Sequence, residues 1–297
     1  MQYLSDKEVL TLEEKANEIR QSIIEMLVEA GSGHTAGPLD MADIFTLLYF
    51  EVLKHDPKNP FWEDRDRLIL SNGHICPVLY ATMAHAGYFP VEELLTLRKF
   101  GSRLQGHPHR ESLPGVETSS GPLGSGLSQA IGMALAERMV NPYSSKYFYC
   151  LTGDGEWDCG QMWEALLLAG KEKLHNLIVI VDRNGIQIDG YTKDIMPLEP
   201  FREKLEAFNW DVQEVDGHNI RSVNDAIGKA QAVYGQPSII IAHTIPSKGV
   251  DVFEHDFRWH GNPPGTEIAG EPPKDEQVKI ALDELHSLGG QIESQHK

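Results

Sequence analysis

Phe148-Tyr149-Cys150-Leu151-Thr152-Gly153-Asp154-Gly155 joins an apolar run, 147–152, to a Gly-Asp-Gly motif. A second apolar run, 176–181, leads into Asp182-Arg183-Asn184-Gly185, and the segment between the runs, 159–173, has the apolar spacing of a helix. The stretch therefore predicts a strand-helix-strand unit with an oxygen ligand, Asp154 or Asn184, after each strand. In open α/β sheets the carboxyl ends of the strands form the edge that binds ligands.

The two motifs have the chemistry of a metal–diphosphate site. Carboxylate and amide oxygens suit Mg²⁺, which binds a few protein oxygens and completes its octahedron with phosphate and water. The glycines beside Asp154 and Asn184 allow the backbone to approach a diphosphate closely. Two such motifs, each ending a buried strand, predict a cofactor site at one edge of the sheet.

Length and composition favour one large α/β domain. The chain has 297 residues, 41% of them hydrophobic, and strands alternate with helices to about residue 245. We expect a parallel β-sheet flanked by helices over 1–270, then a C-terminal helix and polar tail over 271–297 whose last residues are disordered. The other predicted helices are 7–29, 40–52, one that ends at 86, 127–140, 200–208, 221–233 and 276–288, and the other strands are 67–71, 211–215 and 238–243.

Charge and cysteine content exclude several classes of protein. The formal net charge of −18 argues against non-specific nucleic-acid binding and against anionic membrane surfaces. No apolar run approaches the roughly 20 residues of a membrane span, and the polar N-terminus does not have the pattern of a signal peptide. Three cysteines without a CxxC pair favour a reduced compartment over a disulfide framework or a zinc site. We therefore expect a cytoplasmic protein.

Four histidines lie in glycine-rich loops at the ends of predicted elements: His34, His74, His107 and His260. A single histidine is more often a surface or hydrogen-bonded residue, but loops on a rigid sheet are where chemistry concentrates. Histidine suits proton transfer near neutral pH and hydrogen bonds to sugar hydroxyls. A zinc site is the rival interpretation, and the spacing of the four does not match that of zinc ligands.

The long stretch 100–126 has neither helical nor strand periodicity, and loops of this length are usually functional or disordered. It ends in Ser120-Gly121-Pro122-Leu123-Gly124-Ser125-Gly126, directly ahead of the predicted helix 127–140. Glycines at a helix N-terminus can bind an anion through backbone N–H groups. An ordinary glycine-rich turn is the alternative.

Six motifs, in this order, resemble the N-terminal, thiamine diphosphate-binding half of transketolase. They are Ser32-Gly33-His34, Leu70-Ser71-Asn72-Gly73-His74, Gly106-His107-Pro108, Gly121-Pro122-Leu123-Gly124-Ser125-Gly126, Gly153-Asp154-Gly155 with Asn184, and Trp259-His260-Gly261. The resemblance implies the parallel α/β fold of the diphosphate-binding (PP) domain. It also implies an enzyme that transfers a two-carbon ketol unit from a ketose phosphate to an aldose phosphate, with thiamine diphosphate as the electron sink.

The resemblance implies roles for individual residues. Asp154, Asn184 and the Ile186 carbonyl match the ligands of Mg²⁺, or of Ca²⁺ or Mn²⁺ in its place. The catalytic residues would be His34, His74, His107 and His260, which match histidines that bind the donor hydroxyls and help to move protons. The residues that match the thiamine diphosphate site are His74, Gly121, Pro122, Leu123, Gly153, Asp154, Gly155, Glu156, Asn184, Ile186, Lys248 and His260. For Lys248 a mobile surface loop is the alternative.

The match stops before the family's pyrimidine-binding and C-terminal domains. Those domains carry the glutamate that activates the aminopyrimidine and most of the groups that bind the sugar phosphate. The resemblance therefore implies one half of a split transketolase, with little activity by itself, which a separate C-terminal subunit completes in an α₂β₂ assembly. It leaves the sugars open: pentose phosphates are the family default, and a sulfonated or deoxy sugar is an alternative.

Two positions depart from the family pattern. The usual Gly-His-Pro-Gly is Gly33-His34-Thr35-Ala36 here, with residues small enough for the loop to approach the cofactor. Cys159 stands where the family usually has a glutamate that shares protons between the two cofactors, although Glu156 is kept. Either the change is tolerated in a buried polar network, or it weakens coupling between sites or marks a specialised substrate.

Two other functions stay open. The α subunit of a 2-oxoacid dehydrogenase (the decarboxylase) also has Gly-Asp-Gly followed by Asn, but a pyruvate-type donor has few hydroxyls for four histidines to bind. A catalytically silent homologue that binds a partner chain as a scaffold or regulator would not need Asp154, Asn184 and the histidines.

Overall fold

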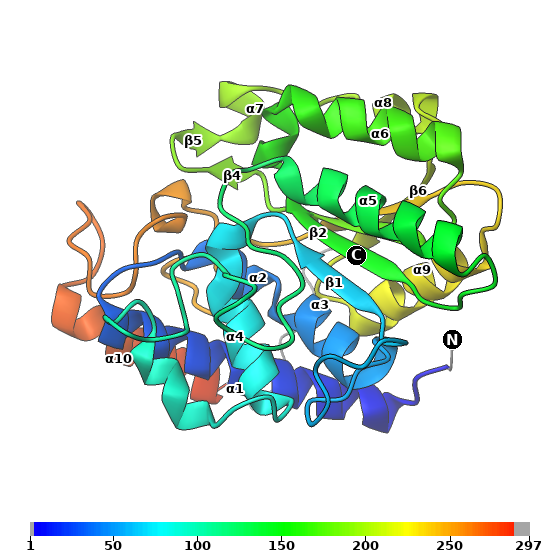
Figure 1. Cartoon of the computed structure of the whole chain (residues 1–297). Helices are drawn as coiled ribbons and strands as arrows, with labels where there is room; N and C mark the ends of the chain where they lie inside the picture. Colours follow the sequence, from blue (N-terminus) through cyan, green and yellow to red (C-terminus); the bar gives the residue numbers. More distant parts are fainter. Residues whose placement is uncertain (1–2, 288–297) are drawn as a thin grey trace.

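A parallel five-stranded sheet lies at the centre of the molecule (Figure 1). The computed structural model describes residues 3–287. The strand order is β1-β2-β3-β7-β6, and all neighbouring strands run parallel. The strand bounds are Arg67–Leu70 (β1), Phe148–Gly153 (β2), Leu177–Arg183 (β3), Asp211–Asp216 (β6) and Ser238–His243 (β7). The parallel α/β fold predicted from the sequence is confirmed.

Helices cover both faces of the sheet (Figure 1). The longer ones are α1 (Asp6–Ala30), α4 (Cys76–His85), α5 (Ser125–Val140), α6 (Gly160–Glu172), α9 (Ile220–Ala232) and α10 (Lys274–Ser287). The shorter ones are α2 (Ala36–Asp40), α3 (Ala42–Leu47), α7 (Thr192–Ile195) and α8 (Phe201–Ala207). Every predicted strand and helix is present within a few residues of its expected bounds, with one exception.

Alternate residues of each central strand enter two different cores. In β3, Ile178 and Ile180 belong to the larger core, which α1, α3, α4 and α9 complete. Val179 and Val181 belong to the smaller core, which α5, α6 and α8 complete. Because successive side chains of a strand point to opposite faces, a strand buried on both sides has a continuous apolar run. This burial explains why the runs 147–152 and 176–181 show no alternation.

The prediction of one continuous helix over 40–52 is wrong. The chain forms α2, then α3, and then a π-helical turn at Leu48–Val52. Every residue of α2 and α3 is buried, so this segment has no polar face from which a helical period could be judged. The break places two carboxyls, Asp40 and Asp43, in the interior, and Asp43 is bound there by Arg20 (2.6 Å from Nη2 to Oδ2) and His218 (2.9 Å).

A small antiparallel hairpin, β4 (Ile186–Gln187) and β5 (Gly190–Tyr191), follows β3 and was not predicted. Strands of two residues are too short to show a period. The hairpin follows the carboxyl end of β3 (Figure 1), and Ile186, Gln187 and Ile188 of this segment line the cavity described below.

The C-terminal helix α10 packs against α1. Ala281 and Leu285 belong to the larger core, and the Asn17 amide donates to the Leu285 carbonyl at 2.7 Å. The predicted disorder of the tail falls on residues 288–297, which lie outside the described part of the chain. Among the helices within 3–287, none is long and apolar enough to cross a membrane.

Candidate cofactor site

The carboxyl ends of β2 and β3 bring the two sequence motifs together. The strands pair in register, Gly153 with Asp182, so Asp154 directly follows one strand and Asn184 the other. The turn after β3 needs a left-handed residue, and Gly185 supplies it at φ 76°. Through this turn the Gly185 N–H donates to Asp154 Oδ2 at 2.8 Å, so the second motif binds the first.

Asp154 is a buried carboxylate with a cationic neighbour. The side chain is 1% exposed, and Arg183 donates to its Oδ2 at 2.7 Å. Burial raises the pKa of Asp154, and the Arg183 guanidinium opposes that effect by favouring the charged form. The ion pair therefore helps to keep an ionised oxygen ligand at this position.

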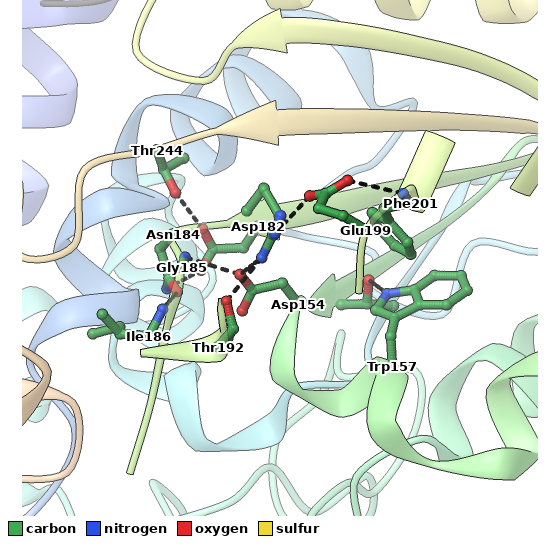
Figure 2. A network of polar contacts seen from close by, with 12 residues as sticks. Asp154, Trp157, Asp182, Asn184, Gly185, Ile186, Thr192, Glu199, Phe201 and Thr244 are labelled. Carbon is green, nitrogen blue, oxygen red and sulfur yellow. Dashed lines mark hydrogen bonds and ion pairs between the residues drawn. The ribbon is translucent and has the colours of Figure 1, made fainter. Parts of the chain in front are cut away.

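The Asn184 amide is held by hydrogen bonds on both of its polar atoms (Figure 2). Its Nδ2 donates to Asp182 Oδ2 at 2.9 Å and to Asp40 Oδ2 at 3.1 Å, and its Oδ1 accepts from the Ile186 N–H at 3.1 Å. These contacts fix the amide with its oxygen on the side of the 184–186 turn. An oxygen in that place retains a lone pair for a cation.

Two buried carboxyls lie behind this amide. Burial raises the pKa of Asp182 to about 8, and burial followed by the charge of Asp182 raises that of Asp40 well above its usual value. At neutral pH the pair therefore holds a proton, because two adjacent buried carboxylates repel each other. Thr244 Oγ1 also donates to Asp182 Oδ1 at 2.5 Å (Figure 2).

Three of the predicted histidines form a cluster of rings. The ring centroids are 4.8 Å apart for His34 and His74, 5.2 Å for His74 and His260, and 5.6 Å for His34 and His260. Burial lowers the pKa of His34 to about 3 and of His260 to about 4, and it also lowers that of His74 well below its usual value. All three imidazoles are therefore neutral at pH 7.

No hydrogen bond to Nδ1 from the described residues fixes the tautomer of His34 or of His260. Nδ1 of His34 and Nδ1 of His260 are buried and have no hydrogen-bond partner in the described residues. By contrast, His218 uses both ring nitrogens, since Nδ1 pairs with Asp43 and Nε2 accepts from the Ile245 N–H at 2.8 Å. A ligand hydroxyl at His34 or His260 can therefore select which nitrogen carries the proton.

The motifs and the histidines line one cavity of about 380 Å³. A volume of this size is in the range of small-molecule and cofactor sites. The predicted residues that line it are His34, His74, His107, Gly121, Leu123, Gly153, Asp154, Gly155, Glu156, Asn184, Ile186 and His260. Of the predicted set, Pro122 and Lys248 are not in this lining.

Lys248 is not on a mobile surface loop, because its side chain is buried. It is 5% exposed and lies 3.7 Å from Glu254, with the neighbouring Ser247 fully buried at φ 64°. A buried lysine needs a counter-charge, and Glu254 supplies it. Its predicted contact with the cofactor stays a prediction.

Two backbone N–H groups of the glycine-rich segment before α5 bind protein acceptors, and the interpretation of the segment as an anion site stays a prediction. The Gly124 N–H donates to Glu156 Oε1 at 3.3 Å, and the Gly126 N–H donates to Ser71 Oγ at 3.1 Å. Ser71 in turn donates to Glu156 at 2.5 Å. Burial raises the pKa of Glu156 to about 7, although the hydrogen bonds that it accepts lower the pKa. The glycine-rich segment thus packs around a carboxyl of the site.

The long loop and the loop after β1 meet closely at this segment. A Cβ on Gly73 would lie 2.3 Å from Ser120 Oγ, so a larger residue would separate the two loops. The approach brings His74 and Gly121 into one cavity lining. The loop 100–124 is therefore ordered by contacts with the site, in agreement with a functional role for its length.

Sequence reasoning missed three lining residues, Asp182, Gln187 and Ile188. Asp182 lies inside a quoted motif, but its role was not visible because its partner Asp40 is 142 positions away (182 − 40). Gln187 and Ile188 belong to the unpredicted hairpin. Their position directly after Ile186 was the only local signal.

The donor set fits a metal that shares its ligands with a diphosphate. Asp154 and Asn184 offer two oxygens to the cavity, and the turn at Ile186 can offer a carbonyl. Over residues 3–287 no group of three or more His, Cys, Asp or Glu side chains could hold a metal ion. A metal held by one carboxylate and neutral oxygens needs phosphate oxygens as well, which is the usual way in which Mg²⁺ binds with a nucleotide or diphosphate.

Residues 12–271 match the family described as transketolase, thiamine diphosphate binding domain. The chain is 43% identical over 251 residues to a 6-deoxy-6-sulfo-D-fructose transketolase subunit of Clostridium sp. (strain MSTE9). The matched residues cover 84% of this chain and 90% of that protein. It is 40% identical over 275 residues to an apulose-4-phosphate transketolase subunit of Actinobacillus succinogenes, with 92% and 95% covered.

The fold is also that of a solved transketolase. Transketolase from Leishmania mexicana superposes with a TM-score of 0.81 at 32% identity, covering 94% of this chain and 45% of that one. The chain thus spans less than half of that enzyme but nearly all of the two subunits. These matches favour the transketolase interpretation over the decarboxylase α subunit. The chain belongs to the transketolase family, as a subunit that carries its thiamine diphosphate-binding domain.

Proposed function

We propose that the chain supplies the thiamine diphosphate- and Mg²⁺-binding half of an enzyme that moves a two-carbon ketol unit from a ketose phosphate to an aldose phosphate. The observation that carries the proposal is one cavity whose lining contains two groups of residues: Asp154 and Asn184, called here the diphosphate side, and the neutral His34, His74 and His260, called here the histidine side. One side suits a metal–diphosphate, and the other suits a polyhydroxylated donor.

In this proposal the histidines bind and orient the donor. A neutral imidazole offers one donor and one acceptor nitrogen, which matches a sugar hydroxyl. His34, His74 and His260 stand close enough together to bind neighbouring hydroxyls of one molecule. His107 belongs to the same lining from the long loop. When bound, thiamine diphosphate supplies the electron sink for cleavage of the C–C bond.

On the diphosphate side, Asp154, Asn184 and the Ile186 carbonyl would hold Mg²⁺, for which Ca²⁺ or Mn²⁺ can substitute. The remaining predicted cofactor contacts are Gly121, Pro122, Leu123, Gly153, Gly155, Glu156 and Lys248. The glycine backbone beside Asp154 leaves room for phosphate oxygens, since Gly153 and Gly155 both line the cavity.

A separate C-terminal subunit with a pyrimidine-binding domain would complete the site in an α₂β₂ assembly. Two observations support a partner. The relatives of similar extent are named as subunits, and Leu123 and Ile188, which line the cavity, remain 39% and 62% exposed. A partner that closes the mouth of the cavity would cover both side chains. We place this assembly in the cytoplasm.

The histidines would recognise only the head of the donor, so the partner would set which sugar is used. The two relatives are named for 6-deoxy-6-sulfo-D-fructose and for apulose 4-phosphate. The first of these names supports a sulfonated or deoxy sugar as the alternative to pentose phosphates, which are the family default.

The first experiment is to capture the tagged chain from its source and identify what co-purifies in equal amount. We expect a chain with a pyrimidine-binding domain, and ketol transfer only when both chains, thiamine diphosphate and Mg²⁺ are mixed. Candidate donors would then be compared with pyruvate. Robust turnover by the isolated chain, or turnover of pyruvate alone, would contradict the proposal.

A further inference from the structure

Arg183 is a cation of the site that the proposed chemistry does not use. Its side chain is 14% exposed and does not line the cavity. Nη1 donates to Asp154 Oδ2 at 2.7 Å and to Thr192 Oγ1 at 3.0 Å, and Nη2 donates to Glu199 Oε1 at 2.9 Å. The guanidinium thus binds a predicted metal ligand and two residues of a more distant segment.

Hydrogen bonds hold both ends of that segment, 192–201. The Thr192 N–H donates to the Gly185 carbonyl at 2.9 Å, and Glu199 Oε2 accepts from the Phe201 N–H at 2.9 Å. The Phe201 ring packs edge-on against Trp157, with centroids 5.2 Å apart. Figure 2 shows Glu199 beside the Phe201 N–H, so the polar contacts run from Asp154 through Arg183 and Glu199 to Phe201.

The arrangement acts mainly on one oxygen of Asp154. The hydrogen bonds from Arg183 and from the Gly185 N–H both fall on Oδ2, and the Gly155 N–H also interacts with this carboxylate. Two donors on Oδ2 fix the rotation of the carboxylate, and Oδ1, which neither Arg183 nor Gly185 binds, is the oxygen that can face a cation. Only arginine has the planar fork that can hold two carboxylates and a hydroxyl from one place, because the lysine ammonium is a compact point charge on a shorter side chain.

We propose that Arg183 is a positioning residue for the cofactor metal: it holds Asp154 Oδ2 so that Oδ1 faces the ion, and it couples that carboxylate to segment 192–201. This inference rests on the proposed function. Removing the guanidinium also removes a positive charge near the metal, which by itself would tighten binding. The positioning effect dominates, because partners that orient metal ligands are typically worth about 10–100-fold in metal affinity.

The test compares R183M with the matched control R202M in the full chain. Arg202 lies on α8 with its side chain 46% exposed, and its partners are Glu206, Glu214 and the Val212 carbonyl, not Asp154. Mn²⁺ binding is followed by electron paramagnetic resonance in the presence of thiamine diphosphate. We expect about 10–100-fold weaker Mn²⁺ binding in R183M and a change of less than about twofold in R202M. Equal or tighter binding by R183M would overturn the inference.

Deuterium exchange gives a second readout that needs no metal. In R183M the Gly185 and Phe201 amides should exchange faster, since both donate to carboxylates that Arg183 binds, whereas R202M should match the native chain. Unchanged exchange over 185–201 would overturn the coupling. If the native chain binds no Mn²⁺, the proposed metal site fails, and the exchange experiment still decides whether Arg183 fastens the segment.

A third variant, R183K, covers the case in which R183M does not fold. It keeps the charge but cannot donate to Asp154 and Glu199 together. We expect Mn²⁺ affinity between those of the native chain and R183M, with faster exchange near Phe201. Native affinity together with native exchange in R183K would show that charge alone suffices and would overturn the positioning role.

Discussion

The two sides of the cavity differ in how completely the protein satisfies their polar groups. On the diphosphate side, Asp154 and Asn184 each have two or more hydrogen bonds from neighbouring residues. On the histidine side, His34 and His260 are held by burial, and their Nδ1 atoms have no partner in the described residues. The chain therefore preorganises the diphosphate side, whereas the orientation of the histidine side depends on its ligand.

The largest effect should come from removing the charge on the preorganised side. We expect Asp154→Asn to weaken Mg²⁺-dependent binding of thiamine diphosphate by about 100-fold, because an amide replaces the only carboxylate predicted to bind the metal. Calorimetric titration of the assembled enzyme measures the change. Asp189→Asn, at an exposed position of the nearby hairpin, is the control. Equal affinity in the two variants would show that the carboxylate of Asp154 does not bind the metal.

On the histidine side, His107 and His109 make a matched pair two positions apart. Both side chains are exposed, but only His107 lines the cavity, and His109 pairs with Ser112 at 3.0 Å. We expect His107→Asn to lower kcat/KM of the assembled enzyme about 10–100-fold, the cost of a lost hydrogen bond to the donor, without a change in cofactor affinity. Steady-state kinetics measure it. A similar loss in His109→Asn would place the effect outside the site.

The two sides should also respond to pH with opposite sign in the metal-free chain. His34 and His260 have pKa values of about 3 and about 4, below the usual 6.5, so the unfolded chain binds more protons between pH 6.5 and about 4. Their contribution to stability is therefore lost as the pH falls. Glu156, with a pKa of about 7, stabilises the fold less as pH rises from about 4.5 to 7.

Single substitutions separate these two contributions to the pH dependence of the free energy of unfolding. Below pH 6.5, His260→Asn should remove a rise of about 1 kcal/mol per pH unit in the free energy of unfolding. Glu156→Gln should remove a fall of similar size with increasing pH between about 4.5 and 7. Urea unfolding at pH 4.5, 5.5, 6.5 and 7.5 measures both. Parallel stability curves for native and substituted chains would mean that these groups do not titrate as their burial requires.

The smallest effect should come from Cys159, which precedes α6 next to the Glu156 network. A Cβ on Gly124 would lie 2.9 Å from the Cys159 Cβ, so the site is closely packed. If the cysteine weakens coupling between sites, Cys159→Glu should raise the Hill coefficient of cofactor binding, with affinity changed by less than about threefold. Cys159→Ser is the control. An unchanged Hill coefficient would favour a tolerated substitution.

Much of the fold was predictable because its signals are local. Each apolar run of the central strands lies between helices of ordinary period, so β2, α6 and β3 were placed within two residues of their observed bounds. The failure at 40–52 had the opposite cause. Where every side chain is buried, periodicity disappears, and packing against α1 and α4 decides where the helix breaks.

Local patterns in the chain were enough to predict that Asp154 and Asn184 each follow a strand and that four histidines lie in glycine-rich loops, because strand ends and turns depend on adjacent residues. The groups that support these residues became visible only in the folded molecule. Asp40 reaches Asn184 across the fold, Arg183 joins Asp154 to Glu199, and Lys248 is buried beside Glu254. Such pairs depend on contacts between distant segments, and no local spacing encodes the distance between two side chains that meet only after folding.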